Sequence, residues 1–256
     1  MIRVENTPNL TGVKISGDYI DLDELVQAFY IICASDYESK HTRYNDMSTR
    51  VLGLCYDIRH AFQGDREVSL VENGMDEEKM KWHSIKAPRN NVYYSCNCLY
   101  PEMFYIMIAL NSLIELRIRI LTKKSYVFSE AFDKNVIWDK SIAQMRILQA
   151  AFAECLKETV SEGTYSRLLN SLNSKYSNIE MLTHQYIDHL NIRYVSMTKE
   201  KRLKNLGSFA RRIANFEYDD EHEKISMTVR DAAKLFDCMP GEIKIKGLDY
   251  PEEIEW

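Results

Sequence analysis

Apolar residues recur every three or four positions along much of the chain, which is the spacing of amphipathic helices. This spacing predicts helices over about 21–33, 44–63, 103–121, 139–161, 164–173, 178–190 and 198–216. The segment 103–121 is apolar on most of its sides, so we expect it to be a buried central helix. Asp21 is placed to cap the first helix and Gly64 to end the second. Ser177 and Glu180 have capping-box spacing before 178–190.

Alternating apolar and polar residues predict short strands over 10–16, 66–72 and 91–98. Two alternatives stay open for 79–85. It is either a strand that pairs with 66–72 across the Asn73-Gly74 turn, or part of a short helix that begins at Asp76-Glu77-Glu78. Towards the C-terminus, the pattern predicts a strand near 225–228, a helix over 229–238 and a strand over 242–246.

The strands lie mainly within the first 100 residues and do not alternate regularly with helices. This order predicts an α+β fold, with a mostly helical body and a small antiparallel sheet contributed mainly by the N-terminal 100 residues. The length of 256 residues fits a single α+β domain over 1–256. A subdivision is possible near 122–138, although we expect the aromatic residues of that segment to pack against the body; they are Tyr126, Phe128, Phe132 and Trp138.

Composition removes several classes of protein. With only 9 glycines and 5 prolines, the chain is neither collagen-like nor rich in flexible linkers. A net charge of −5 argues against a general coat of nucleic acid or membrane. The apolar run Met103–Ile114 is shorter than the ~20 residues that a membrane span requires, and the N-terminus lacks a signal-peptide pattern. Four of the 6 cysteines lie within apolar patterns, which suits reduced core thiols, so we expect a cytoplasmic protein.

The motifs of nucleotide and cofactor chemistry are missing from the sequence. There is no P-loop, no Gly-x-Gly-x-x-Gly and no Gly-x-Ser-x-Gly elbow, so we expect no cofactor. The spacing of His184 and His189 turns them away from a shared ion on a helix. Cys96 and Cys98 share the apolar face of a predicted strand, where core packing explains them. We therefore expect no metal site.

The densest polar cluster spans 57–66. Asp57 and His60 are three positions apart on a predicted helix, so their side chains can meet, and Asp65 and Arg66 follow directly. A carboxylate that orients an imidazole suits acid–base chemistry, which makes these four residues the candidate catalytic set for hydrolysis or transfer. The alternative is ordinary helix-end chemistry, because a histidine in the last turn is favoured by the helix dipole alone.

The predicted helix 198–216 has the clearest functional surface. Lys201, Lys204, Arg211 and Arg212 gather on the face opposite its apolar residues and are candidates for binding phosphates or an acidic partner. An acidic run, 217–223, follows at once and is expected to screen or pair with these bases. This proximity argues against nucleic acid as the partner.

Two stretches of the N-terminal 70 residues resemble an uncharacterised family of bacterial proteins. One is Asn6–Val13 with Gly17-Asp18-Tyr19 and Asp21-Leu22, and the other is Arg50–Gly53 with Tyr56–Ala61. The resemblance implies a bacterial, cytosolic setting and carries over no activity and no catalytic residue.

Together these observations favour a cytosolic, non-catalytic interaction or regulatory protein. Its partner is another protein or a second copy of the chain in a homodimer, without membrane contact. Two alternatives stay open, an enzyme that uses the cluster at 57–66 and a nucleic-acid-binding protein that uses the basic helix 198–216.

Overall fold

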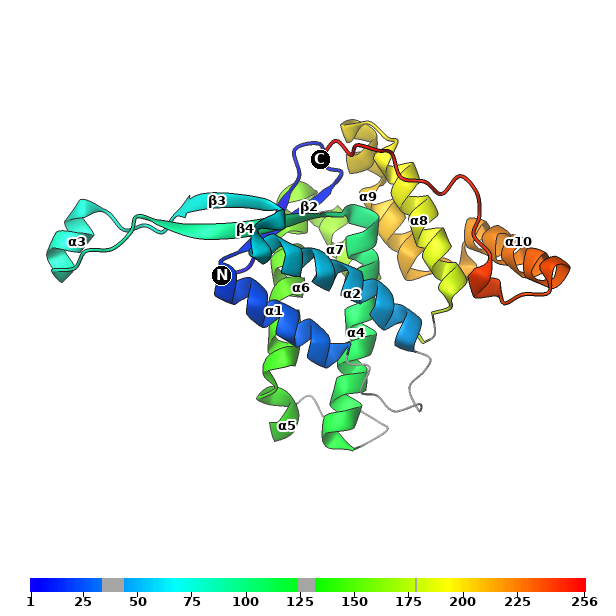
Figure 1. Cartoon of the computed structure of the whole chain (residues 1–256), viewed down its shortest axis with the longest axis horizontal. Coiled ribbons are helices and arrows are strands. Elements are labelled where there is room, and N and C mark those ends of the chain that lie inside the picture. Colours follow the sequence, from blue (N-terminus) through cyan, green and yellow to red (C-terminus); the bar gives the residue numbers. More distant parts are fainter. Residues whose placement is uncertain (34–43, 124–131, 178) are drawn as a thin grey trace.

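The structure, a computed structural model, describes residues 1–33, 44–123, 132–177 and 179–256 (Figure 1). It confirms the α+β fold, since helices form most of the body and the sheet comes from the N-terminal part of the chain. The described strands are β1 (Arg3–Asn6), β2 (Gly12–Gly17), β3 (Glu67–Glu72) and β4 (Asn90–Leu99). They form one antiparallel sheet in the order β1-β2-β4-β3.

The helices agree with most of the expected ranges. Their bounds are α1 Tyr19–Ile32, α2 Asn45–His60, α3 Glu77–His83, α4 Tyr100–Thr122, α5 Lys134–Ile137, α6 Lys140–Thr159, α7 Glu162–Leu172, α8 Met181–Val195, α9 Lys199–Ala214 and α10 Asp220–Phe236. A π-helical turn, Ala61–Asp65, follows α2, and short 3-10 turns occupy Phe216–Tyr218 and Pro240–Glu242.

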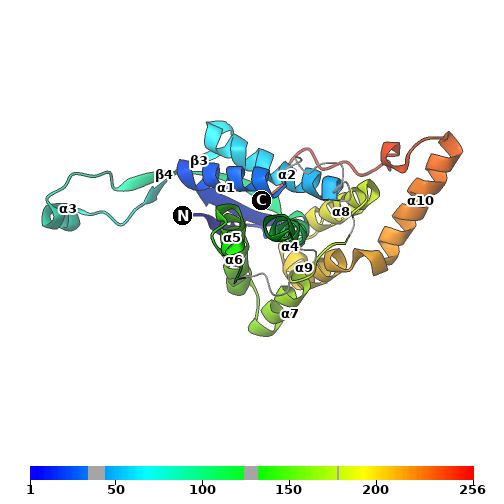
Figure 2. The same ribbon diagram turned by 90° about the horizontal axis from the view of Figure 1, so that it is seen from below.

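Strand β4 joins the body to a projecting arm. Its residues Tyr94–Leu99 pair with β2, whereas its outer residues Asn90–Tyr93 pair only with β3. The hairpin of β3 and β4, with α3 at its tip, therefore extends away from the other elements (Figures 1 and 2). Gly12 permits the close pairing at the inner end, because a Cβ there would lie 2.0 Å from the Cys98 carbonyl oxygen.

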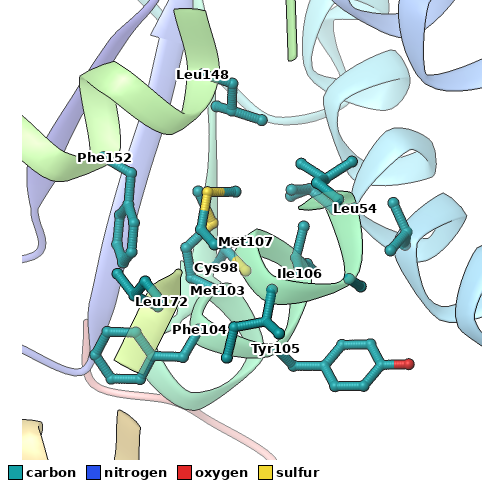
Figure 3. Close-up of a cluster of buried hydrophobic side chains, with 14 of the residues drawn as sticks. Leu54, Cys98, Met103, Phe104, Tyr105, Ile106, Met107, Leu148, Phe152 and Leu172 are labelled. Atoms are coloured by element: carbon teal, nitrogen blue, oxygen red, sulfur yellow. The ribbon is translucent and has the colours of Figure 1, made fainter. Parts of the chain in front are cut away.

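The buried centre is α4, as the sequence predicts. Pro101 lies in its first turn, where a missing N–H costs nothing. Helices α1, α2, α6, α8 and α9 pack around α4, and Figure 3 shows its side chains among those of α2, α6 and α7. Phe104 and Phe152 meet edge to face with ring centroids 5.9 Å apart. Each fully buried side chain of this size contributes roughly 1.5–3 kcal/mol to folding.

Several local expectations were wrong. Asp18, rather than Asp21, caps α1, and Asp21 closes the capping box from the third helical position. Glu180 precedes α8 without a side-chain capping bond, so the Ser177–Glu180 capping box is not formed. For 79–85 the helical alternative is the right one, because Asp76 caps α3 through the Lys79 amide at 2.8 Å. The real partner of β3 is β4.

The prediction of two strands near the C-terminus was also wrong. Residues 225–228 lie inside α10, where Ile225, Val229 and Ala233 fall on one helical face. Within 242–246, Glu242 ends a 3-10 turn, Lys246 begins another turn, and the residues between them belong to none of the described strands. Instead, the Gln185 side-chain amide bonds the Ile243 carbonyl oxygen at 2.8 Å and the Ile245 amide at 2.9 Å. One amide side chain thus replaces a neighbouring strand.

The expected subdivision near 122–138 stays a prediction. Tyr126 and Phe128 lie outside the described residues. Phe132 is 87% exposed and Trp138 is 82% exposed, so the expectation that they pack against the body was wrong. Among the described helices, none combines the length and apolarity needed to cross a membrane.

Candidate functional site

The cluster at 57–66 lies at the end of α2 and in the turn after it. His60 Nδ1 lies 2.8 Å from Asp65 Oδ2, and Arg66 Nη2 donates to Asp57 Oδ1 at 3.0 Å. Asp57 and His60 are therefore paired with residues beyond the helix instead of with each other. Gly64 allows this return of the chain, because its φ of 90° is open mainly to glycine.

These pairs join the last turn of α2 to the residues just beyond it, which stabilises the end of the helix. The side chains of Asp57 and Arg66 are each 43% exposed, and Asp65 is 57% exposed. His60 also lies against the Tyr56 ring, with centroids 4.2 Å apart. Catalytic acid–base groups need a concave site that excludes water from the reacting atoms. Asp57 lines a cavity, but His60, Asp65 and Arg66 do not line it, so the enzyme hypothesis stays a prediction.

A buried charged network, which the sequence analysis missed, surrounds Arg50 of α2. Its guanidinium forms a two-point contact with Glu102 of α4, in which Arg50 Nε lies 2.8 Å from Glu102 Oε1. Arg50 Nη2 also donates to Asp188 Oδ1 of α8 at 2.8 Å, and Nη1 donates to the His184 carbonyl oxygen at 3.0 Å. One cation thus connects three helices.

The C-terminal segment covers this network. Tyr250 donates to Asp188 at 3.2 Å and accepts from the Asn191 amide at 3.0 Å. With Ile254 and Trp256, Tyr250 forms one wall of a cavity of about 420 Å³, which Asp57 also lines. Burial alone lowers the pKa of Arg50, but Glu102 and Asp188 outweigh burial and raise it. Four of the five guanidinium N–H groups donate to protein acceptors, so we assign Arg50 to stability.

A signal for Arg50 was present in the sequence. It lies between Met47, Val51 and Leu54 on the apolar face of α2, where a charged residue needs a buried partner. The sequence could not name that partner, because Glu102 and Asp188 come from distant helices.

The basic residues of the predicted helix 198–216 have different surroundings. Arg212 is neutralised by the acidic run, since its guanidinium contacts Asp219 at 2.7 Å and Glu221 at 2.6 Å. Lys201 is exposed and forms no ion pair within the described part of the chain. Lys204 and Arg211 line a groove between α7 and α9.

This groove has a volume of about 550 Å³ and brings three cations together: Arg167 from α7 with Lys204 and Arg211 from α9. Its described wall contains no carboxylate. The hydroxyl groups of Thr159, Ser161, Thr164, Ser171 and Ser208 complete its polar lining. Cations and hydroxyl donors in one concavity match the needs of an anion.

The groove follows from how α7 meets α9. Lys204, Gly207 and Arg211 recur on one face of α9, and Thr164 of α7 lies against this face, with its Cγ2 4.0 Å from where a Gly207 Cβ would be. Thr164 Oγ1 accepts from Ser161 and from Arg167, each at 3.2 Å. These bonds hold Arg167 at the groove. The sequence analysis missed Arg167 because helix pairing alone brings it to the basic face of α9.

Metal and thiol chemistry have no support in the described regions. No group of three or more His, Cys, Asp or Glu side chains there is arranged to hold a metal ion. His189 lies 3.2 Å from Glu221, and its side chain is 39% exposed. Cys96 and Cys98 are both buried, as the strand pattern predicts, and burial raises the pKa of each thiol.

Comparison with known proteins places the whole chain in one group. No curated protein and no solved structure matches it. The family model described as a domain of unknown function, DUF6904, matches residues 2–256. The match extends well beyond the N-terminal 70 residues that carry the resemblance in the sequence and agrees with an uncharacterised family. The chain therefore belongs to the DUF6904 family.

Proposed function

We propose that the protein is a non-catalytic interaction protein that binds an anionic segment of a partner protein in the groove between α7 and α9. The observation that carries this proposal is the convergence of Arg167, Lys204 and Arg211 on one concavity whose described wall has no carboxylate. In a chain of net charge −5, such a basic concavity is a local exception. Uncompensated cations that converge in this way select negative charge.

The chemistry of the lining suits carboxylate or phosphate groups. Arginine presents paired N–H donors that match both anions, and lysine adds a mobile point charge. The volume of about 550 Å³ lies within the ~300–1,000 Å³ of typical ligand sites, so it accommodates a few side chains of a peptide.

A protein partner fits the surroundings better than a nucleic acid does. The acidic residues that follow α9 neutralise Arg212, which leaves a compact basic site in place of a long basic track. Nucleic-acid binding generally relies on many cations spread along the backbone. A cytoplasmic location, in which the free cysteines stay reduced, is part of the same proposal.

The test is fluorescence anisotropy on the full chain with two labelled probes, an oligo-glutamate peptide and a phosphoserine peptide. We expect saturable binding of at least one peptide, weakened by high salt. Lys204→Gln, Arg211→Gln and Arg167→Gln each remove a charged donor. Each variant should therefore weaken binding about tenfold, which corresponds to the loss of one charge-assisted contact.

Lys201→Gln is the matched control. It removes the same charge from the same helix, but Lys201 does not line the groove, so binding should stay within about twofold of wild type. The proposal fails if neither peptide binds at low ionic strength. It also fails if the control weakens binding as much as the groove variants, because net charge alone would then explain the effect.

A further inference from the structure

The two edges of the sheet differ in how far other elements cover them. At one edge, α6 packs against β1, and Asn6 Nδ2 donates to Thr159 Oγ1 of α6 at 2.8 Å. At the other edge, β3 lies on the projecting arm, and all but one of its residues are exposed (Figures 1 and 2). Strand edges that stay unpaired usually carry charged residues, Pro or a bulge. In β3 the charged residues, Glu67 and Glu72, lie only at the two ends, and the four residues between them include no charge and no Pro.

The arm also exposes apolar side chains on one face. Val68 is 50% exposed and Leu70 is 70% exposed, and they lie on the same face because strand residues alternate. Val92 of β4, which is opposite Leu70 in the register, is 43% exposed and widens this apolar strip. An open edge beside an apolar strip is a surface that pairs with another strand.

The sequence of this face is complementary to itself. Arg66, Val68, Leu70 and Glu72 follow one another on the face, with a cation at one end and an anion at the other. When the strand is laid antiparallel against a copy of itself about Ser69, Arg66 lies opposite Glu72 and Val68 lies opposite Leu70. Both charged pairs then attract, and both apolar pairs pack.

We propose that β3 pairs antiparallel with β3 of a second copy of this chain, with the two Ser69 residues opposite each other. The two sheets then continue into one across a two-fold axis, in an isologous contact. Since the strands run in opposite directions, the arm tip of each copy points towards the body of the other. Trp82 on α3, which is 83% exposed, is thereby brought next to the second body.

The register is tested by charge reversal. Light scattering after size exclusion should give a dimer for wild type. Arg66→Glu places Glu opposite Glu, and Glu72→Arg places Arg opposite Arg, twice in each dimer. Each variant should therefore weaken dimerisation about tenfold or more.

Mixing the two variants should restore association as a one-to-one heterodimer. In the proposed register, the introduced glutamate of one chain lies opposite the introduced arginine of the other. The native Glu72 of the first chain likewise lies opposite the native Arg66 of the second. Both charged pairs of the heterodimer therefore attract, whereas each variant alone brings like charges together.

Two further variants complete the test. Arg66 also contacts Asp57, so its variant is checked by circular dichroism, and Glu72→Arg gives the same test without breaking that contact. Glu5→Arg reverses a charge on the covered edge and should leave the dimer intact. A monomeric wild type overturns the proposal. So does a dimer that both single reversals leave unchanged, or single variants that fail to associate when mixed.

Discussion

Arg212 Nε donates to Asp219 Oδ2 at 2.7 Å, and Arg212 Nη2 donates to Asp219 Oδ1 at 3.1 Å. This two-point contact neutralises one cation of the basic helix and connects the end of α9 to the start of α10. The neighbouring Arg211 points elsewhere, because consecutive residues on a helix are separated by about 100°. Arg211 lines the groove, and the two adjacent arginines therefore have separate roles.

Arg212→Gln should lower the free energy of unfolding by about 1–3 kcal/mol, because Asp219 and Glu221 would lose their charged donor. Arg211→Gln, the matched control, should change stability by less than about 0.5 kcal/mol, since Arg211 is exposed. Urea denaturation measures both values. Equal losses in the two variants would contradict the assigned roles.

The same contact predicts a response to acid. Burial raises the pKa of Asp219 and Glu221, but Arg212 outweighs burial and the net pKa of each carboxyl is lowered. Their contribution to stability is complete above the usual carboxyl pKa of about 4 and is lost as pH falls through the lowered values. Arg212→Gln should therefore lose less stability than wild type between pH 5 and pH 3. Parallel curves for the two proteins would exclude this linkage.

Arg50→Leu should destabilise the protein by roughly 3–5 kcal/mol, since it leaves Glu102 and Asp188 without their buried cation. The control is Arg89→Leu, which breaks an exposed ion pair with Glu77 and should cost under about 1 kcal/mol. Thermal and urea unfolding compare the two variants. A mild effect of Arg50→Leu would show that the network can be replaced by apolar packing.

Two half-buried histidines predict a loss of stability below neutral pH. Burial lowers the pKa of His184 and of His222, and Arg50 lowers that of His184 further. The unfolded chain therefore binds protons first, near pH 6.5, and stability falls as pH drops below that value. His184→Gln combined with His222→Gln should flatten the change in Tm between pH 7.5 and pH 5.5. An unchanged slope would assign this pH dependence to other groups.

The cysteines should differ in reactivity. Burial raises the pKa of Cys55 and Cys96 to about 12, so their reactive thiolates are scarce at neutral pH. Cys238 is half-buried, whereas the other five cysteines are buried. A thiol reagent should label one site quickly in the native protein and all 6 in denaturant. Cys238→Ser should abolish the fast phase, and its persistence would point to opening of the core.

Local patterns were sufficient where burial decides the structure. The apolar spacing of α4 and the alternation of β4 identified a buried helix and a half-buried strand, because each pattern has one stable way to hide its apolar side chains. The pattern failed at 242–246. The residues there alternate as in a strand, but the backbone forms hydrogen bonds with the Gln185 side chain instead of with a neighbouring strand.

Only part of the candidate site could be predicted from the sequence. Lys204 and Arg211 could be named because they share a face of one helix. Arg167 could not be named, since only the packing of α7 on α9 brings it to them. His60 was assigned to Asp57 by helical spacing, but the chain beyond Gly64 returns and offers Asp65 instead.

The sequence by itself determined the fold class, the central helix and the basic face of α9, because these follow from periodicity within one element. The tertiary structure alone decided which charges are buried, which are neutralised and which line the groove. Arg50 and Arg212 are paired by carboxylates that packing brings to them, while Arg211 is left facing the groove. Electrostatic pairing depends on distances across the fold, and no local pattern encodes those distances.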